Sequence, residues 1–324
     1  MTTNTQKNEH SGGYFRPRRL GHVNLYVADM DKTMSFYTKV LGIQEAYRTP
    51  LGGGGFVSNG NTHHDLGFTD AYGALGKPRG AQPGQLSHIA FELESETELV
   101  ASYRKATADG VKFLRTADHD IAHSAYGQDP EGVVYELYAD VVKDWRRQRH
   151  GIVTKPKPDW YPGLTPPVDE VCYHDKPEIT RVTDAVFHPK RTTHASIVVD
   201  DLEQAIDHYL KIVGLSLDPA SRGKPFAILK GSCGERSLVL HRSHPNRGAG
   251  YHHVSLEVAS PAELDASVKR AKSSGLHIRS DVSHLGRRAV TLNDPDDTLV
   301  CFYADEAGEP PAAEVDVDLA LFIL

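Results

Sequence analysis

Two pairs of repeated segments constrain the fold of this 324-residue chain more than any other feature of its sequence. The stretch HVNLYVADMDKTMSFYTKVLGI at 22–43 matches HASIVVDDLEQAIDHYLKIVGL at 194–215 without a gap, at an offset of 172. A second stretch, HIAFELESETELVASYRKATADG at 88–110, matches HVSLEVASPAELDASVKRAKSSG at 253–275, at an offset of 165. Self-similarity of this kind indicates a fold that is built from repeated structural units.

Each repeated segment predicts a strand followed by a helix. In the first one, Val23, Leu25 and Val27 alternate with other residues along a strand, and apolar residues at helical spacing follow. Both copies of the second segment are followed by an Asp-Pro turn and by a last strand that ends in Tyr-Ala-Asp. Four βαβββ modules therefore account for most of residues 20–305, and the fold class we expect is α+β.

The rest of the chain divides around these modules. Residues 141–192 contain Trp145, Trp160 and many prolines, so this segment is too aromatic for a flexible linker and we expect it to pack on the domains. The chain ends in the apolar residues ALFIL, which we expect to dock on their own chain or on a second subunit. The expected division is an arm at 1–19, an N-terminal domain at 20–140, the intervening segment at 141–192, a C-terminal domain at 193–305 and a tail at 306–324.

The composition excludes several classes of protein. The formal net charge is −7 and no basic domain is present, which argues against a general nucleic-acid binder. No apolar run approaches the roughly 18 residues that a membrane span needs. The three cysteines, Cys172, Cys233 and Cys301, have neither disulfide-framework nor zinc-ribbon spacing. We therefore expect a cytoplasmic protein that binds neither nucleic acid nor membranes.

Strand alternation places three potential metal ligands on corresponding faces of the modules. His22 lies opposite the apolar face of its strand, and so does His88. Glu136 lies opposite Tyr135 and Leu137, where a carboxylate costs several kcal/mol unless it is paired, protonated or bound to metal. If two modules form one curved sheet, the three side chains converge in a shared cup. Two histidines and one carboxylate with open positions form the facial triad of non-haem Fe(II) oxygenases.

The chain resembles the vicinal oxygen chelate superfamily and, within it, the two-domain type I extradiol (catechol-type) ring-cleavage dioxygenases. The spacing of 66 residues from His22 to His88 and 48 more to Glu136 is similar to the metal triad of that family. The segment HHDLGF at 63–68 resembles the strand that supplies a pocket histidine, which points to His64. The segment DHDIAHSAYGQDPEG at 118–132 resembles a loop with another histidine and an active-site tyrosine, which points to His119 and Tyr126.

The resemblance implies a fold, a metal and a reaction. The fold would be two vicinal-oxygen-chelate (glyoxalase/bleomycin-resistance-like) domains, with the N-terminal domain binding metal. The metal would be Fe(II), although Mn(II) accepts the same ligands, His22, His88 and Glu136. The substrates would be an aromatic diol of the catechol type, whose ring is opened next to the two hydroxyls, and O2, in aromatic catabolism. We also expect a homo-oligomer; the particular catechol stays open.

The chemistry of such a reaction suggests roles for His64, Tyr126 and His119. His64 would take a proton from the substrate and return one later. Tyr126 would hydrogen-bond the deprotonated substrate oxygen, and His119 would support the catecholate or the pocket wall. His123 is an alternative to His119. We expect His63 to point outward, because neighbouring strand residues face opposite sides.

The second domain retains only part of this set. Its equivalents of His22 and His88 are His194 and His253, but Cys301 stands at the position of Glu136. The equivalents of His64, Tyr126 and His119 are Arg236, Thr291 and His284. We therefore interpret this half as a degenerate scaffold, unlike the commoner arrangement in the family, in which the C-terminal domain holds the iron. If the second module paired with the third, His194 would replace His22 as a ligand.

Two other functions are compatible with the same pattern. A metal-dependent isomerase or epimerase of the superfamily would use a fourth protein ligand, which His64 or Asp65 would supply. A non-catalytic binding protein would hold no metal.

Overall fold

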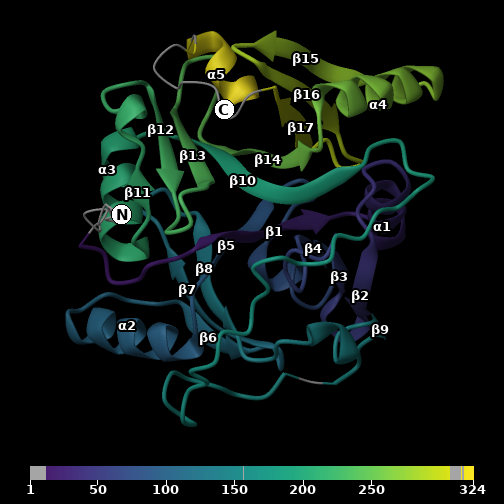
Figure 1. Ribbon diagram of the computed structural model, residues 1–324. Helices are drawn as coiled ribbons and strands as arrows, with labels where there is room; N and C mark the ends of the chain where they lie inside the picture. Colours follow the sequence, from purple (N-terminus) through teal and green to yellow (C-terminus); the bar gives the residue numbers. More distant parts are fainter. Residues whose placement is uncertain (1–11, 156, 307–314, 316) are drawn as a thin grey trace, which may run out of the picture.

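The computed structural model describes residues 12–155, 157–306, 315 and 317–324 (Figure 1). Parts of the expected arm and tail, residues 1–11, 307–314 and 316, lie outside the described residues. The described chain forms two mixed β-sheets with helices packed against them, which confirms the predicted α+β class. None of the described helices is long and apolar enough to cross a lipid bilayer.

The first sheet contains nine strands, from the first two modules and from the segment that follows them. These strands are β1 (Arg19–Val27), β2 (Glu45–Thr49), β3 (Gly54–Val57), β4 (Leu66–Asp70), β5 (Leu86–Glu92), β6 (Arg115–Asp118), β7 (Ala122–Gln128), β8 (Val134–Asp140) and β9 (Gly151–Ile152). Their order across the sheet is β6-β7-β8-β5-β1-β4-β3-β2-β9. The two modules therefore join at the β5–β1 pair, near the middle of the sheet.

The second sheet contains eight strands from the third and fourth modules. These strands are β10 (Pro189–Val199), β11 (Ser216–Leu217), β12 (Phe226–Lys230), β13 (Arg236–Arg242), β14 (Gly250–Val258), β15 (Ile278–His284), β16 (Arg287–Asn293) and β17 (Leu299–Asp305). Their order is β11-β12-β13-β10-β14-β17-β16-β15. In Figure 1 the second sheet lies above the first, with β10 running beside β1.

The helices follow the first strand of each module, as the repeats predict, and one more lies in the tail. They are α1 (Met30–Lys39), α2 (Glu96–Ala108), α3 (Leu202–His208), α4 (Pro261–Ser273) and α5 (Val317–Ile323). Short helical turns are η1 (Pro50–Gly52), η2 (Lys77–Arg79), η3 (Trp145–Arg147), η4 (Tyr209–Val213) and η5 (Pro219–Ser221). The apolar faces of both sheets meet their helices in one continuous core that includes Tyr37, Phe91 and Phe302.

Strand pairing is the same in both sheets and shows how the modules combine. β1 runs antiparallel to β5 and parallel to β4, while β10 runs antiparallel to β14 and parallel to β13. The last strands, β8 and β17, run parallel to β5 and β14. The modules therefore pair in sequence order, and His22 lies in a different sheet from His194.

The two Asp-Pro turns join the domains by a pair of matching hydrogen bonds. Tyr37 on α1 donates its hydroxyl proton to Asp294 in the second domain, with a distance of 3.0 Å between the oxygens. Tyr209, which is equivalent to Tyr37 in the repeat, donates to Asp129 in the first domain at 2.9 Å. Each domain thus satisfies a buried hydroxyl of the other, which fixes how the two sheets pack.

The segment 141–192 lies against both domains. Its residues Gly151–Ile152 form the edge strand β9, parallel to β2. The Trp160 ring stacks on His123 with 4.3 Å between the ring centroids, and Thr116 donates a hydrogen bond to the Trp160 carbonyl at 2.6 Å. At the other end of the segment, Phe187 stacks on Phe302 of the second domain at 4.2 Å.

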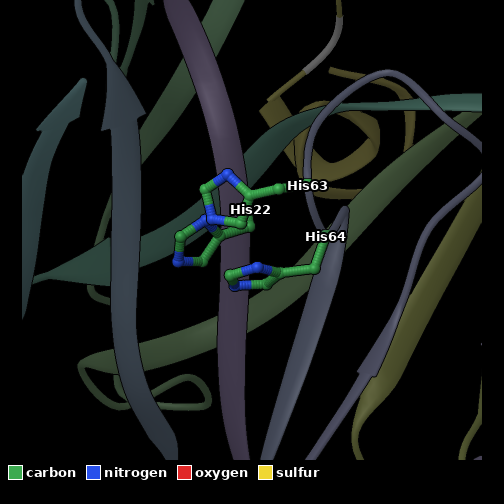
Figure 2. A group of neighbouring side chains, drawn as sticks. All are labelled: His22, His63 and His64. Carbon is green, nitrogen blue, oxygen red and sulfur yellow. The ribbon is translucent and has the colours of Figure 1, made fainter. Parts of the chain in front are cut away.

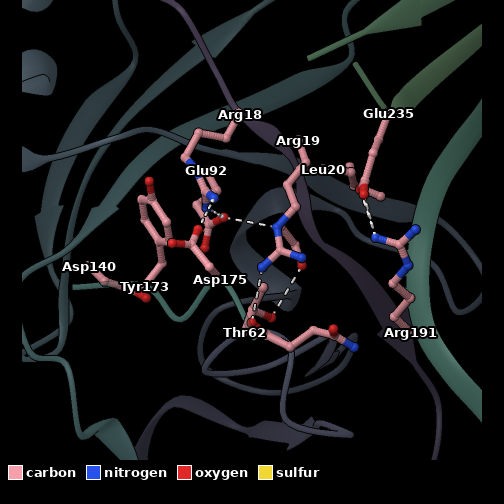
Figure 3. A network of polar contacts seen from close by, with 12 residues as sticks. Arg18, Arg19, Leu20, Thr62, Glu92, Asp140, Tyr173, Asp175, Arg191 and Glu235 are labelled. Atoms are coloured by element: carbon pink, nitrogen blue, oxygen red, sulfur yellow. Dashed lines mark hydrogen bonds and ion pairs between the residues drawn. The ribbon is translucent and has the colours of Figure 1, made fainter. Parts of the chain in front are cut away.

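A network of charged groups holds the same segment at the start of β1 (Figure 3). Glu92 accepts hydrogen bonds from Arg18 at 2.7 Å and from Arg19 at 2.9 Å. The Arg18 guanidinium lies 3.0 Å from the centre of the Tyr173 ring and 3.3 Å from the Asp175 carboxylate. The buried carboxylate of Glu92 is thereby paired, and Tyr173 is fixed against the first sheet.

The tail packs on its own chain, against the helix-free face of the second sheet. Buried Leu321, Ile323 and Leu324 belong to the part of the chain around α5, and Ile323 and Leu324 join an apolar cluster with Phe226 and Tyr303 of that face. The corresponding face of the first sheet has no such cover from α5. It carries the polar residues described next.

Candidate metal centre

Three neighbouring strands bring His22, His88 and Glu136 together. His22 on β1 and Glu136 on β8 both stand opposite Ala90 of the intervening strand β5. His88 precedes Ala90 by two residues and so faces the same side of the sheet. The small side chain of Ala90 lets the histidines and the carboxylate converge above it. Strand alternation predicts that the three side chains lie on this face. The pairing of β1, β5 and β8 brings them close to one another.

The donor atoms of these residues fit a single metal ion. The Glu136 Oε2 atom lies 3.1 Å from His22 Nε2 and 3.1 Å from His88 Nε2, and the two Nε2 atoms are 3.3 Å apart. Ligands about 2.0–2.2 Å from one ion and at right angles to each other are about 3 Å apart. Three mutual distances of this size are typical of one triangular face of an octahedron, which leaves the opposite face for other ligands.

Burial and mutual contact give these groups the charge states that a metal requires. Burial alone raises the pKa of Glu136, but the contacts with His22 and His88 outweigh it and hold the pKa well below its usual range. Burial lowers the pKa of His22 to about 4, against the opposing effect of Glu136. An ionised carboxylate and a neutral imidazole are the forms that bind metal ions.

Tyr126 and His119 line the side of the cup next to Glu136. Tyr126 on β7 stands opposite Glu136 on β8, and its hydroxyl lies 3.1 Å from His119 Nε2. His119 Nε2 is also 3.6 Å from Glu136 Oε1. His119 lies in the turn between β6 and β7, and Asp120 in this turn has a φ of 63°. The structure therefore brings both sequence-predicted residues to the triad.

His123, the alternative to His119, lies elsewhere. Its position on β7 has the opposite parity to that of Tyr126, so it faces helix α2. There its Nδ1 atom lies 2.6 Å from Glu96 Oε1, and its ring stacks on Trp160. The geometry favours His119 as the pocket residue.

His64 and His63 both lie against His22 (Figure 2). The His64 ring is 3.9 Å from the His22 ring, between centroids, and 4.8 Å from Phe56. The expectation that His63 points outward is wrong, because His63 is 3% exposed and its Nδ1 atom lies 2.9 Å from Asp140. The two histidines lie in an irregular loop before β4, where strand alternation does not apply.

Asp65 does not point toward the triad. Its carboxylate accepts hydrogen bonds from the Asn59 backbone N–H at 2.6 Å and from the Thr62 hydroxyl at 3.2 Å. These bonds close the loop that carries His64. Asp65 therefore supports the loop, and His64 is the remaining candidate for a fourth ligand from the first module.

The site also contains two cationic residues that the sequence analysis did not identify. Lys157 Nζ lies 2.7 Å from His119 Nδ1, and the Arg115 guanidinium lies 3.5 Å from the centre of the Tyr126 ring. Arg115 stands on β6 opposite Tyr126, so the β6–β7 pairing would have indicated it. Lys157 comes from the segment 141–192, whose path no periodicity in the sequence predicts.

The second domain does not assemble an equivalent centre. Its His194 Nε2 atom lies 2.6 Å from the Leu324 carbonyl oxygen, and the His194 and His253 rings are 6.4 Å apart. Cys301 faces the tail, with its sulfur 4.0 Å from the Phe322 carbonyl oxygen. Within the described residues, the two groups of at least three possible metal donors that lie within 4.8 Å of one another are His22–His88–Glu136 and His22–His63–His64.

Comparison with known proteins agrees with this architecture. The 24%-identical catechol-2,3-dioxygenase of Bacillus subtilis (strain 168) aligns over 79% of this chain and 80% of its own length. The 2,2',3-trihydroxybiphenyl dioxygenase of Sphingomonas paucimobilis is 30% identical over 124 residues, which are 36% of this chain and 40% of that protein. The match to this second relative thus spans less than half of its length.

A solved structure and a family model extend the comparison to both domains. The 2,3-dioxygenase LapB from Pseudomonas sp. KL28 superposes with a TM-score of 0.65 at 14% identity, over 94% of this chain and 97% of LapB, and so shares its fold. The model of the Glyoxalase/Bleomycin resistance protein/Dioxygenase superfamily matches residues 19–137 and 191–302, which are the two repeated halves. The resemblance seen in the sequence is therefore confirmed at this level, and the chain belongs to the Glyoxalase/Bleomycin resistance protein/Dioxygenase superfamily.

Proposed function

We propose that this protein is an Fe(II)-dependent extradiol dioxygenase that opens the ring of a catechol-type substrate with O2. The observation that carries the proposal is the set of three donor atoms, His22 Nε2, His88 Nε2 and Glu136 Oε2, which lie 3.1–3.3 Å apart on the helix-free face of the first sheet. Several relatives are named as dioxygenases, and the name of one of them describes it as putatively ring-cleaving, which supports the same class.

The triad would hold the metal. His22, His88 and Glu136 would be its ligands, and Fe(II) or Mn(II) accepts this set of nitrogen and oxygen donors. When bound, the ion supplies Lewis-acid and one-electron redox chemistry to a chelating diol and to O2. The protein would contribute the steps that involve protons and orientation.

His64 would accept a proton from a substrate hydroxyl. Burial and the neighbouring His22 and His63 lower its pKa well below the usual range, so the imidazole is neutral. Its Nδ1 atom has no hydrogen-bond partner among the described residues. Phe56 packs edge-on against the ring and keeps it beside His22. A neutral, oriented imidazole is the form that a general base requires.

Tyr126 would donate a hydrogen bond to the deprotonated substrate oxygen. Burial and the nearby Glu136 raise its pKa well above the usual range, so the hydroxyl keeps its proton. His119 is neutral as well, because burial and the nearby Lys157 lower its pKa. The 3.1 Å contact between His119 Nε2 and the tyrosine hydroxyl would orient that hydroxyl toward the triad.

Metal analysis together with oxygen uptake tests the proposal. Protein loaded with Fe(II) under anaerobic conditions should consume O2 and form a coloured ring-fission product with at least one member of a catechol panel. Glu136→Ala should lose both bound metal and activity. The control is His194→Ala, at the position equivalent to His22 in the repeat. This variant should keep its metal, because His194 lies in the other sheet.

The alternative functions give different results in the same assays. Stoichiometric metal without O2 uptake on any catechol would favour a metal-dependent isomerase or epimerase, in which His64 supplies the fourth ligand. Protein that binds neither Fe(II) nor Mn(II) would favour a non-catalytic binding role.

The proposal also includes location and assembly. The free cysteines Cys172, Cys233 and Cys301 are compatible with a reducing cytoplasm. We propose a homo-oligomer, which light scattering of the purified protein would show as a mass that is a multiple of 35.6 kDa.

A further inference from the structure

The open side of the candidate site faces two cations. The exposed fraction of the side chains rises from 2% for His22 and 4% for Glu136 to 12% for His88 and 20% for His119. The triad is therefore deepest, and the site opens toward His119. Beyond His119 lies Lys157, which is exposed at the protein surface.

Arg115 marks the same opening from the sheet. Across neighbouring strands, Arg115 stands opposite Tyr126, which stands opposite Glu136. This row runs from the edge strand β6 to the triad, and its outer member is the exposed Arg115. A ligand at the triad would thus have Tyr126 beside it and Arg115 at its outer end.

Neither cation forms an ion pair with a carboxylate among the described residues. The nearest acidic residue of the turn, Asp120, already pairs with Arg149 at 2.7 Å and with Lys155 at 2.6 Å. Within the part of the chain that the structure describes, no carboxylate oxygen lies within 4.0 Å of the Lys157 ammonium or the Arg115 guanidinium. Two such charges at one opening are notable in a chain whose net charge is −7.

Contacts made by residues before and after Lys157 in the sequence hold it at the opening. Lys155 pairs with Asp120, and Trp160 is fixed by its stacking on His123 and by the hydrogen bond from Thr116. The backbone on either side of Lys157 is thereby attached to the β6–β7 hairpin. Ordering the lysine for ligand binding would cost correspondingly little entropy.

We infer that the substrate is a catechol with an anionic ring substituent, such as a carboxylate, which pairs with Lys157 and Arg115. This inference rests on the proposed function. The two hydroxyls of the diol would lie at the triad, so a substituent on the far side of the ring would point back toward the opening. A guanidinium and an ammonium bind a carboxylate through charge-assisted hydrogen bonds, which are stronger than neutral ones.

The experiment compares ligands that differ in charge and little in shape. The carboxylated probes are 3,4-dihydroxybenzoate and 2,3-dihydroxybenzoate, and the neutral probes are the corresponding dihydroxybenzamides and 4-methylcatechol. Dissociation constants are measured by calorimetry on anaerobic, metal-loaded protein, and kcat/KM by O2 uptake. The proteins are wild type, Lys157→Met, Lys157→Arg, Arg115→Gln and the matched control Lys211→Met, which removes an exposed lysine of the second domain that pairs with Asp207.

Wild type should bind at least one benzoate about tenfold or more tightly than the amide of the same ring. Lys157→Met and Arg115→Gln should each lose about tenfold in affinity for that benzoate and less than about twofold for the neutral probes. Lys157→Arg should keep the preference, and Lys211→Met should behave as wild type.

Two results would overturn the inference. One is a wild type that does not distinguish the benzoates from the amides. The other is an equal loss on charged and neutral probes in Lys157→Met, which would make Lys157 a positioning residue that acts through His119. Because binding and turnover are measured separately, turnover of neutral catechols without a charge preference would leave the proposed function intact. A charge preference without ring cleavage would instead reject the proposed function alone.

Discussion

Hydrogen-bond geometry at His119 determines which of its nitrogens carries the proton. A Lys157 ammonium can only donate, so its 2.7 Å contact requires His119 Nδ1 to accept. In a neutral imidazole the proton then lies on Nε2, which faces the Tyr126 hydroxyl. The tyrosine oxygen accepts from Nε2, so its own proton points away from His119. A residue outside the modules thus sets the direction of a hydrogen bond inside the cup.

His64 provides a prediction about catalysis at the scale of one residue. Replacing it by asparagine removes the proposed proton acceptor, and general acid–base groups typically contribute about 10²–10⁴-fold to rate. His64→Asn should therefore lower kcat with catechols by about that factor, as measured by O2 uptake, while the metal content stays that of wild type. The exposed His150 offers a matched control, since His150→Asn should change neither quantity. If His64→Asn loses its metal instead, His64 is a ligand and the isomerase alternative gains support.

The tail helix α5 shows how one element changes the use of a repeated fold. It covers the face of the second sheet that corresponds to the face of the first sheet with His22, His88 and Glu136. The Leu324 carbonyl oxygen contacts His194, and Arg287 donates to the Ile323 carbonyl at 2.9 Å. His194 and Arg287 on this face therefore contact the end of the chain itself.

Leu321 tests the contribution of this element to stability. Its side chain is 2% exposed, and Leu→Ala changes at such sites typically cost about 2–5 kcal/mol. Leu321→Ala should lower the free energy of unfolding by about 2 kcal/mol or more in urea titrations, with Fe(II) binding at the first domain unchanged. Leu164, which is 46% exposed, gives the matched control, and Leu164→Ala should change stability little. Equal stability of the two variants would mean that the Leu321 side chain is not buried in solution.

At the scale of the whole molecule, the burial of Asp294 between the two domains makes stability depend on pH. Burial raises the pKa of Asp294 to about 6, despite opposing hydrogen bonds from the backbone of Thr298 and Asp296. In the unfolded chain the carboxyl titrates near its ordinary pKa of 3.8. Below pH 3.8 both states are protonated and the group carries no penalty. As pH rises to about 6, the unfolded state ionises first, so stability is lost over this window.

Asp294→Asn tests this linkage. A difference of about two pKa units corresponds to roughly 3 kcal/mol. The free energy of unfolding of Asp294→Asn relative to wild type should therefore rise by up to about that amount between pH 4 and pH 7, as measured by denaturant titration at each pH. The exposed carboxylate of Asp207 is a suitable control, and Asp207→Asn should not reproduce this slope. A relative stability that is independent of pH would show that Asp294 ionises as readily in the folded protein as in the unfolded chain.

The sequence by itself determined what depends on nearby residues. The repeats gave the four modules and the α+β class, because each strand and helix leaves its own periodicity in the chain. Alternation also placed His22, His88 and Glu136 on helix-free strand faces, since parity is a local property. The expectation for His63 failed for the same reason: it assumed a strand where the chain forms an irregular loop.

Only the tertiary structure decided what depends on residues far apart in the chain. The pairing of β1 with β5, rather than of the second module with the third, selected His22 over His194 as the neighbour of His88. The path of the segment 141–192 brought Lys157 to His119, and the tail closed the second cup. These contacts are made by side-chain packing between segments that share no periodicity, so no local pattern of the sequence encodes them.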